Sequence, residues 1–482
     1  MGGAASSKPK TKRINTQPCA EQKIGYKEPK VIHDPVMCCS QPVKLERKAT
    51  VISPSPPGSR QGRTLRRGST IVSLGMRKSL PTMESTSYFL LIGDIGGTNC
   101  RLNLFEVGRG ETYIEGGPLP GVRVHHAQYL NGDYPSFLAI VQAFFSMAPS
   151  KCQNDLPVSA CFAVAGPVDG NAVAFTNRAG WVIDGNQLAE QLQIPHIRLI
   201  NDFVANGYGL LTLKREETVT LQDAPVKQGA PIACIGAGTG LGETFLTCRD
   251  GQYDAWPSEG GHAEFAPRNE LQIKLLHFLM KRFKSTSRVS VERIVSGIGL
   301  VNVYEFLREQ FPEKILPTVD QELVQAKDMG GRVVASNASK CTLCKMAMEI
   351  MVDVYGSECG TGALKWLPFG GLYIAGGLAP KNLKFFTDSP TFMDAFLDKG
   401  RVSPALKQVP IKIVLAEDIG QRGALLVAVR AMQKARRSFN LHRPSLAISG
   451  EEPNVLSPLL PPRMQGYHTT DGYEESLDVI HA

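Results

Sequence analysis

The stretch that most constrains the fold is Ser87–Val107, which reads SYFLLIGDIGGTNCRLNLFEV. Its apolar run Tyr88–Ile92 predicts a short buried strand, and Arg101–Phe105 then resumes in strand alternation. Between them lies a turn with two adjacent glycines. Such a turn lets backbone N–H groups approach a bound group closely, and a polyphosphate with its magnesium ion would suit it. Taken alone, the stretch fits an ordinary hairpin equally well.

The same arrangement occurs again later in the chain. The apolar strand Pro231–Ile235 leads into the glycine-rich turn 236–242, a second strand, the turn Asp250-Gly251 and a third strand. Asp-Gly between two strands predicts a tight hairpin, and Gly108-Arg109-Gly110 takes its place in the first copy. Internal duplication is typical of two related halves. We therefore expect a phosphate group to be held between the two turns.

Length, charge and cysteine content narrow the class of protein. The 482 residues suffice for two or three domains, and no apolar run is long enough to predict a transmembrane helix. Eleven scattered cysteines favour reduced thiols in the cytoplasm. Residues 1–86 hold sixteen Lys and Arg against five Asp and Glu, so the rest of the chain carries a net charge of −3. A nucleic-acid partner is therefore not expected.

The two ends of the chain differ from its middle. Residues 1–86 are basic, rich in Pro and Ser and without hydrophobic periodicity, and 437–482 are similarly aperiodic, so we predict disorder in both. Met1-Gly2 followed by Ser6 fits the N-myristoylation pattern. The basic residues that follow would supply the second signal that one acyl chain needs. The leader thus predicts partial, reversible membrane attachment of a cytoplasmic protein.

The middle of the chain alternates strands with helices, which predicts an α/β fold. We place a small domain at 87–210, a large domain at 211–417, and a helix at 418–436 that returns to the small domain. The predicted strands after the first three-stranded unit are 157–165, 197–200, 371–375 and 411–415. The predicted helices are 137–147, 185–193, 203–213, 268–284, 290–311, 322–335, 338–366 and 420–436.

Asp202 is the main catalytic candidate. It follows a buried strand, where open α/β sheets carry their chemistry, and Asn201 stands beside it. A carboxylate there could accept a proton from a substrate hydroxyl while the amide orients that hydroxyl. The alternative is that Asp202 caps the following helix.

Three further residues have the chemistry of a sugar site. Glu259 and His262 flank two glycines and could bind hydroxyls that both donate and accept; a metal site is the rival interpretation, weakened by the lack of a second histidine. Glu292 stands at a predicted helix start, where a favourable charge is the simpler explanation. The pair Cys341 and Cys344 has no partner motif for zinc. Leu241 breaks the dinucleotide fingerprint, and no Walker motif is present.

With these residues in view, the chain resembles the bacterial-type glucokinase family, whose members have a two-domain ribonuclease H-like or actin-like ATPase fold with an interdomain cleft. The matching segments are LIGDIGGTN (91–99), FTNRAGW (175–181), INDF (200–203), GAGTGLG (236–242), SEGGHAEFAP (258–267), VERIVSGIGLVNVY (291–304) and LYIAGGL (372–378). They occur in the family's order over residues 87–436. The family motif commonly reads GEGGH, and Ser258 replaces its first glycine.

The resemblance implies transfer of the γ-phosphoryl group of ATP to the 6-hydroxyl of glucose with Mg²⁺, the first step of glycolysis. Asp202 would be the general base. Sugar hydroxyls would be bound by Asn201, Glu259, His262, Glu292, Thr176 and Asn177. The nucleotide would be bound by Asp94, Gly96, Gly97, Thr98, Asn99, Gly236, Gly238, Thr239, Gly240, Gly376 and Gly377, with Asp94 supporting the metal through water.

Two other functions stay open at this stage. A kinase for another hexose would share the phosphate turns, and a non-catalytic nucleotide-binding module of the actin or Hsp70 type would share the fold. The second would not need Asp202 and the three sugar candidates together. The expected partners are glucose and ATP, a membrane surface contacted by myristoyl-Gly2 and the leader, and a second copy in a homodimer.

The acylation prediction is tested with Gly2→Ala. In cells that myristoylate proteins, the parent should divide between membrane and supernatant fractions, and the variant should shift toward the supernatant because the acyl chain contributes about 0.8 kcal/mol per buried CH₂. Equal partitioning of the two proteins would rule out the acyl anchor.

Overall fold

The computed structural model describes residues 86–150, 152, 155–175, 181–326 and 329–441. The leader, its myristoylation pattern and the tail beyond residue 441 lie outside this part and stay predictions. Among the helices that are described, none combines the length and the apolar character needed to cross a bilayer.

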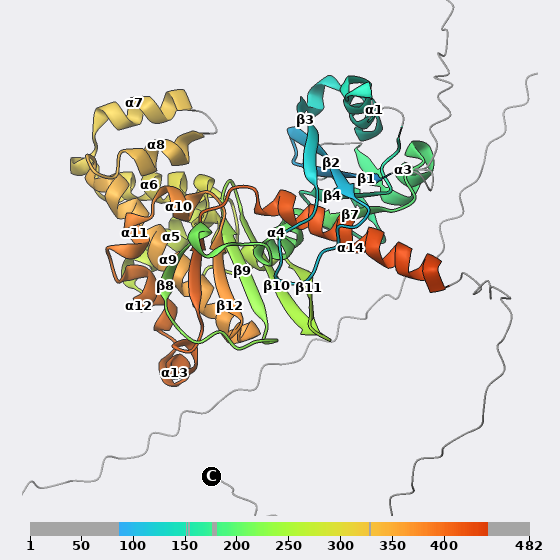
Figure 1. Cartoon of the computed structure of the whole chain (residues 1–482). Coiled ribbons are helices and arrows are strands. Elements are labelled where there is room, and N and C mark those ends of the chain that lie inside the picture. The colour runs from blue at the N-terminus through green and yellow to red at the C-terminus, as the bar shows by residue number, and fades with distance from the viewer. Residues whose placement is uncertain (1–85, 151, 153–154, 176–180, 327–328, 442–482) are drawn as a thin grey trace, which may run out of the picture. The chain divides into compact units, whose positions relative to one another are not determined.

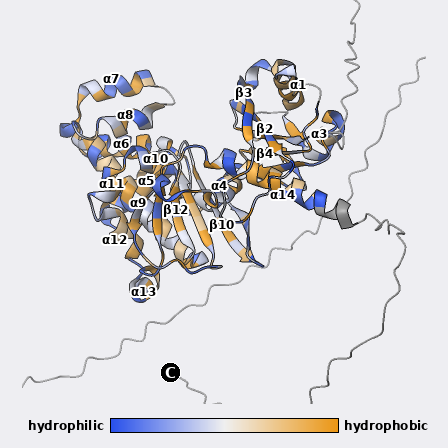
Figure 2. Cartoon of the chain, viewed as in Figure 1, coloured by the Kyte–Doolittle hydropathy of each residue, from blue (hydrophilic) through white to orange (hydrophobic). Residues whose placement is uncertain are grey.

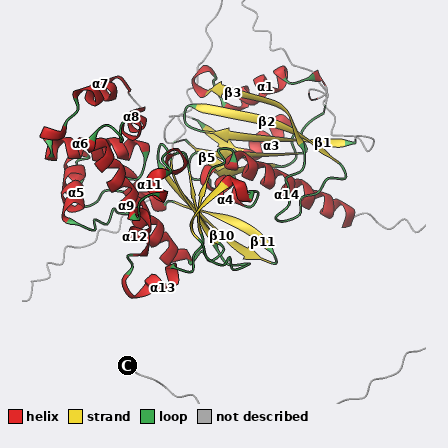
Figure 3. Ribbon diagram, turned by 60° about the vertical axis from the view of Figure 1, so that its left-hand side comes forward, coloured by secondary structure: helices red, strands yellow, loops and turns green. Residues whose placement is uncertain are grey.

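The first sheet has five strands in the order β3-β2-β1-β4-β7. Strands β1, β2 and β3 pair antiparallel (Figure 3). Strands β4 and β7 continue the sheet parallel to β1. The strands are β1 (Ser87–Ile95), β2 (Asn99–Gly108), β3 (Val122–Leu130), β4 (Ser159–Val164) and β7 (Ile197–Asn201). A separate two-stranded ribbon pairs β5 (Ala172–Ala174) with β6 (Val182–Asp184).

Alternation along β1 divides its side chains between two cores. Leu91 packs in one core with Phe144 of α1 (Phe137–Met147). Leu90 and Ile92 pack in the other with Leu426 of α14 (Ile419–Leu441). A sheet covered on both faces needs apolar residues on both sides of its central strands, so β4 is buried along its whole length, as its continuous apolar run predicts.

The second sheet has six strands in the order β11-β10-β9-β12-β13-β8 (Figure 1). Strands β9, β10 and β11 pair antiparallel, β12 and β13 run parallel to β9, and β8 closes the edge antiparallel to β13. Asp250 and Gly251 both have positive φ in the turn between β10 and β11, as Asp-Gly predicts. The strands are β8 (Thr218–Gln222), β9 (Ile232–Ala237), β10 (Leu241–Arg249), β11 (Gln252–Ser258), β12 (Gly371–Ala375) and β13 (Ile411–Val414).

The largest core lies between this sheet and the helices that follow it in sequence, and the strands show their apolar character in Figure 2. At its centre the hydroxyl of Tyr355 donates to the Ile235 carbonyl and accepts from the Ala237 N–H, both at 3.1 Å, which pins α9 to β9. The helices are α5 (Glu270–Arg282), α6 (Gly297–Gln310), α7 (Pro317–Ala326), α8 (Gly330–Ser336), α9 (Thr342–Trp366), α10 (Leu378–Lys381), α11 (Lys384–Thr387), α12 (Thr391–Leu397) and α13 (Ser403–Leu406).

Helix α4 (Asp202–Leu210) packs against both α14 and the strands β10 and β11. Its contact with α14 is close enough to require glycine on each side. A Cβ at Gly209 would lie 1.9 Å from the Ile419 carbonyl oxygen, and one at Gly423 would lie 1.8 Å from that of Ala205. Since both approaches are to rigid backbone, these glycines set how near the two helices come.

Several elements of the structure have bounds that differ from the prediction, and others lie where no element was predicted. The helix predicted at 290–311 begins at Gly297, because Ser296 caps it through the Gly299 N–H, and the one predicted at 322–335 is the two helices α7 and α8. The short helices α10–α13 and the edge strand β8 were not predicted. The helices have four to seven residues, too few to develop a hydrophobic period, and β8 has no buried residue that would mark it as a strand.

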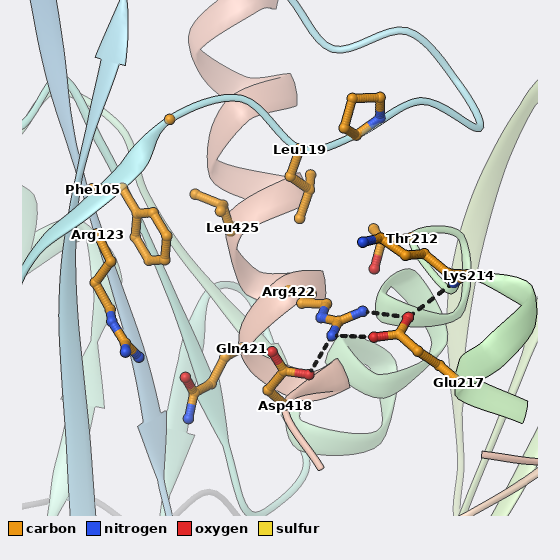
Figure 4. Close-up of a pocket in the computed structure, with 12 residues that line it drawn as sticks. Phe105, Leu119, Arg123, Thr212, Lys214, Glu217, Asp418, Gln421, Arg422 and Leu425 are labelled. Atoms are coloured by element: carbon orange, nitrogen blue, oxygen red, sulfur yellow. Dashed lines mark hydrogen bonds and ion pairs between the residues drawn. The ribbon is translucent and has the colours of Figure 1, made fainter. Parts of the chain in front are cut away.

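An ion cluster ties the start of α14 to the chain segment that follows α4. Arg422 donates to both carboxylate oxygens of Glu217 at 2.9 and 2.6 Å and contacts Asp418 at 2.9 Å. Figure 4 shows this cluster in the wall of a pocket of about 490 Å³. The pKa of Glu217 is lowered to about 2, and the hydrogen bonds from Arg422 are the main cause.

Replacing Glu217 with Gln should lower the free energy of unfolding at pH 7 by roughly 1.5–3 kcal/mol, the usual range for hydrogen bonds to a charged group. Because the folded-state pKa is depressed, the parent's advantage is present above pH 4.5 and is lost as the pH falls toward 2. Thermal melting of both proteins across this range measures the difference. The matched control is Glu216→Gln, since Glu216 is exposed in the same short turn; an equal effect of the two substitutions would contradict the prediction.

Candidate active site

The turn between β1 and β2 is held by an asparagine from the end of β3. The Asn131 side-chain amide donates to the carbonyls of Gly96 at 2.8 Å and Gly97 at 3.2 Å. Its backbone N–H donates to the Thr98 carbonyl at 2.8 Å. Asn131 is 1% exposed, so this arrangement is fixed from within the protein. The turn is therefore braced, while Thr98 at its tip is exposed.

Asp94 and Asn99 lie at the two ends of this turn. Asp94 faces Arg101 across the β1–β2 ladder and forms an ion pair with it at 3.1 Å. The Asn99 side-chain oxygen accepts from Gln128 of β3 at 3.2 Å. Both predicted residues are thus part of the same turn, with a carboxylate on one side and an amide on the other.

Asp202 is the first residue of α4, and its neighbour Asn201 is the cap. The Asn201 side-chain oxygen accepts from the N–H groups of Phe203 at 2.9 Å and Val204 at 3.2 Å, and its amide donates to the Gly166 carbonyl at 3.2 Å. The capping role considered for Asp202 therefore belongs to Asn201, and the Asp202 carboxylate accepts a hydrogen bond from the Phe203 N–H at 2.9 Å.

The environment of Asp202 makes it a stronger base than an ordinary aspartate. Burial is the main cause that raises its pKa from 3.8 to about 6, and the negative charges of Asp94 and Glu259 add to it. The hydrogen bond from Phe203 acts in the opposite direction. A carboxyl group with a pKa near 6 is still ionised at neutral pH, and it accepts a proton more readily than a solvent-exposed one.

The second glycine-rich turn is braced by residues from another part of the chain. The Gly238 N–H donates to the Gly240 carbonyl, and the Gly297 N–H donates to the Gly238 carbonyl, both at 2.8 Å. Glu292 accepts from the Leu241 N–H at 3.0 Å. A Cβ at Gly240 would lie 2.6 Å from the same carboxylate oxygen, so a larger residue there would push the Glu292 side chain aside.

Close packing places Asp202 beside this second turn. Phe203, the next residue, fills the space over Gly242, where a Cβ would lie 2.0 Å from its ring. A Cβ at Gly236 would lie 3.0 Å from the same ring. The glycines at 236 and 242 therefore make room for α4 as well as shaping a turn.

The three sugar candidates come together. The Nε2 atom of His262 lies 3.9 Å from Glu259, and its Nδ1 atom lies 4.0 Å from Glu292. Glu292 belongs to the short 3-10 turn Val291–Arg293 and not to the start of a long helix, which corrects the predicted bounds. Glu259 and His262 are largely exposed, as groups that meet a soluble ligand must be.

The loop that carries Glu259 is held by two bonds that sequence reasoning did not anticipate. The Ser258 hydroxyl accepts from the Gly260 N–H at 3.1 Å, so the serine that departs from the family motif stabilises the loop. Arg288 donates to the His262 carbonyl at 2.7 Å. No residue pattern marks Arg288 in advance; Asn131 could have been noticed as a polar residue at the end of a strand adjacent to the Gly96-Gly97 turn.

The remaining predicted residues are less closely tied to this site. Gly376 has a φ of +78° at the end of β12, and a Cβ there would lie 2.4 Å from the Ala237 carbonyl oxygen, so packing alone explains that glycine. Gly377 lies near Lys381. Thr176 and Asn177 fall outside the described residues. Within residues 86–441 as described, no three His, Cys, Asp or Glu side chains gather as a metal site.

Known proteins are similar to this chain over the whole region from the first turn to α14. The profile of the family described as Glucokinase matches residues 91–431. Glucokinase of Nostoc sp. (strain PCC 7120) is 43% identical over 354 residues, which are 71% of this chain and 99% of that protein. Glucokinase of Escherichia fergusonii is 34% identical over 340 residues, which are 70% of this chain and 95% of that protein.

Solved structures show the same likeness. A crystal structure of glucokinase from an Antarctic psychrotroph has a TM-score of 0.58 and 27% identity, covering 71% of this chain and 99% of that one. Glucokinase from Balamuthia mandrillaris in complex with glucose has a TM-score of 0.55 and 20% identity, covering 71% of this chain and 94% of that one, which shows a shared fold.

Proposed function

We propose that this chain, which belongs to the glucokinase family, transfers the γ-phosphoryl group of ATP to the 6-hydroxyl group of glucose. The observation that carries the proposal is the grouping of Asp202 with Glu259, His262 and Glu292 beside two braced glycine-rich turns. Relatives named glucokinase match this chain over nearly their whole length, and the match includes all of these residues' positions.

Asp202 acts as the general base in this proposal. Its carboxylate takes the proton of the 6-hydroxyl as that oxygen attacks the γ-phosphorus of ATP, and the bond from the γ-phosphorus to the bridging oxygen breaks to release ADP. Phosphoryl transfer needs little from the protein beyond positioning and charge stabilisation. The sugar hydroxyls are positioned by Glu259, His262 and Glu292, and the two ring nitrogens of His262 lie 3.9 Å from the Glu259 carboxylate and 4.0 Å from that of Glu292.

The two glycine-rich turns hold the phosphates. Their backbone is fixed by Asn131 in one turn and by Glu292 and Gly297 in the other, so the N–H groups need no rearrangement when an anion binds. Asp94 is the residue that would hold Mg²⁺, through water. A site of one carboxylate fits this ion, which commonly binds through one or two carboxylates and substrate phosphates. When bound, the ion neutralises phosphate charge.

The two meanders are the basis of a finer proposal on the fold. Strands β1, β2 and β3 and strands β9, β10 and β11 each form an antiparallel unit joined first by a glycine-rich turn. Each unit extends into parallel strands on the same side, β4 and β12. This shared order supports a duplicated actin-like ATPase fold. Membrane attachment through Gly2 and a homodimer stay predictions.

A kinase for another hexose is the nearest alternative, because the phosphate turns and the general base do not choose the sugar. Assays with glucose, fructose, mannose and N-acetylglucosamine at equal concentration separate the two. We expect the highest kcat/KM with glucose. A higher value with any other sugar would replace glucose as the proposed substrate.

A non-catalytic nucleotide-binding module is the second alternative. Such a protein has no need for a carboxylate of raised pKa beside side chains that can bind the hydroxyl groups of a sugar. The arrangement around Asp202 therefore disfavours this alternative. ADP release that requires glucose would exclude it directly.

The base role is tested with Asp202→Asn. The substitution keeps the side-chain shape but removes the proton acceptor, so kcat should fall about 10² to 10⁴-fold while glucose binding measured by calorimetry changes little. The matched control is Asp254→Asn on the exposed part of β11, which should retain full activity. A variant at position 202 that keeps more than about a tenth of kcat would exclude the base role.

The pH profile gives an independent reading of the same group. Because only the ionised carboxylate accepts a proton, kcat/KM should rise with pH and level off above about 6, the pKa of Asp202. In the parent protein a midpoint near the ordinary 3.8 would contradict the raised pKa.

A further inference from the structure

A buried glutamate lies directly beneath the loop that carries Glu259 and His262. Glu243 stands on β10, is 2% exposed, and faces the side of the sheet that α9 covers. Its Oε1 atom has no hydrogen-bond partner within the described part of the chain. A buried polar atom without a partner costs free energy, so its retention in a core calls for an explanation.

The other carboxylate oxygen explains why the loop needs glycine at position 260. A Cβ on Gly260 would lie 1.8 Å from Oε2 of Glu243 and 2.6 Å from its Cδ atom. The backbone of Gly260 does not have a positive φ, so a larger residue there is opposed by lack of space and not by conformation, and it would displace either the buried carboxyl group or the loop. The carboxyl group thus forms the surface on which the backbone of the loop rests.

The same loop is fixed from its other sides. A Cβ on Gly261 would lie 2.1 Å from the Leu241 carbonyl oxygen, and the Ser258 hydroxyl accepts from the Gly260 N–H. Glu243 pairs with Ser258 across the β10–β11 ladder. Glu243 therefore lies under Gly260 and is also the cross-strand neighbour of Ser258, whose hydroxyl accepts from the Gly260 N–H.

The groups around Glu243 favour its neutral form. Burial is the main cause that raises its pKa to about 8, and Glu358 on α9 adds to it, while Lys365 on α9 acts in the opposite direction. A neutral carboxyl group can sit in this core without a cation. The other titratable groups that face it are Cys234 on β9 and Tyr355 and Cys359 on α9, and the pKa of each is raised by burial.

We propose that Glu243 is a positioning residue for sugar binding: its carboxyl group, packed under Gly260, sets the height of the loop that presents Glu259 and His262. The inference rests on the proposed function, because it assigns that loop to the sugar. Glu243 does not touch the substrate in this account. It acts by fixing the backbone between two residues that do.

The test is a double-mutant cycle between positions 243 and 260. Gly260→Ala places a methyl group where the Glu243 carboxyl group lies, and Glu243→Ala removes the side chain on which the loop rests. Each should displace the loop and raise the KM for glucose, by up to about 10²-fold for a loop displacement near 1 Å. The KM for ATP should change less than about twofold in either. In the combined variant the methyl group fills the space that the carboxyl group left. Its KM for glucose should therefore lie well below the product of the two single effects.

Matched controls separate this effect from general destabilisation. Gly110→Ala adds a methyl group where nothing lies within 4 Å, and Glu190→Ala removes an exposed glutamate; neither should change the KM for glucose. Effects at 243 and 260 that multiply without coupling, or that raise both KM values alike, would overturn the inference. If the parent does not phosphorylate glucose at all, the proposed function fails instead.

Glu243→Gln supplies a second measurement in case the alanine variants fold poorly. It keeps the shape of the side chain and cannot ionise, so the KM for glucose at pH 7 should stay within about twofold of the parent's. Above pH 8 the parent's carboxyl group ionises beside Glu358, so its KM for glucose should rise, whereas the Gln variant should show no such rise. Identical pH profiles for the two proteins would overturn the inference.

Discussion

The placement of helix α4 is the constraint on which the rest of the site depends. Where it meets α14, the two backbones approach so closely that Gly209 on α4 and Gly423 on α14 are required. Phe203 fills the space over Gly242 on the second sheet. A helix held in this way cannot shift without a collision, because packed interiors have few voids to absorb movement. Asp202, at its first turn, therefore has a fixed position relative to the second glycine-rich turn.

The raised pKa of Asp202 follows from that placement. Asp202 is brought near two other carboxylates, Asp94 and Glu259, in a partly buried environment, and its pKa rises as a result. Asn201 takes the capping bonds that would otherwise engage a carboxylate at this helix start. The adjacent pair thus divides two tasks: the amide caps the helix, and in the proposed function the carboxylate accepts the proton.

Polar side chains from other parts of the chain lie against the loops that surround the candidate site. Asn131 holds the first turn, Glu292 holds the second, and Glu243 lies under the loop that carries Glu259 and His262. Asn131 and Glu292 are distant in sequence from the turns they support, and both bond to backbone atoms there. Backbone held from within needs little reorganisation when a charged ligand arrives, which is how preorganised sites stabilise developing charge.

The sequence by itself determined the alternation of strands and helices and the Asp-Gly hairpin, and its motifs supplied the candidates for the site, which stay predictions. These are local patterns: a period of two or 3.6 residues, or a turn whose residues need positive φ. The helix 137–147 was predicted with the bounds that α1 has, whereas the segment 290–311 was not, because a serine cap inside it decides where α6 begins. Only the tertiary structure decided that Asn201 is the cap, that Glu292 braces a turn about fifty residues earlier, and that Glu243 lies under Gly260. Those contacts join residues distant along the chain, and no local pattern encodes which distant backbone atom a buried polar side chain will meet.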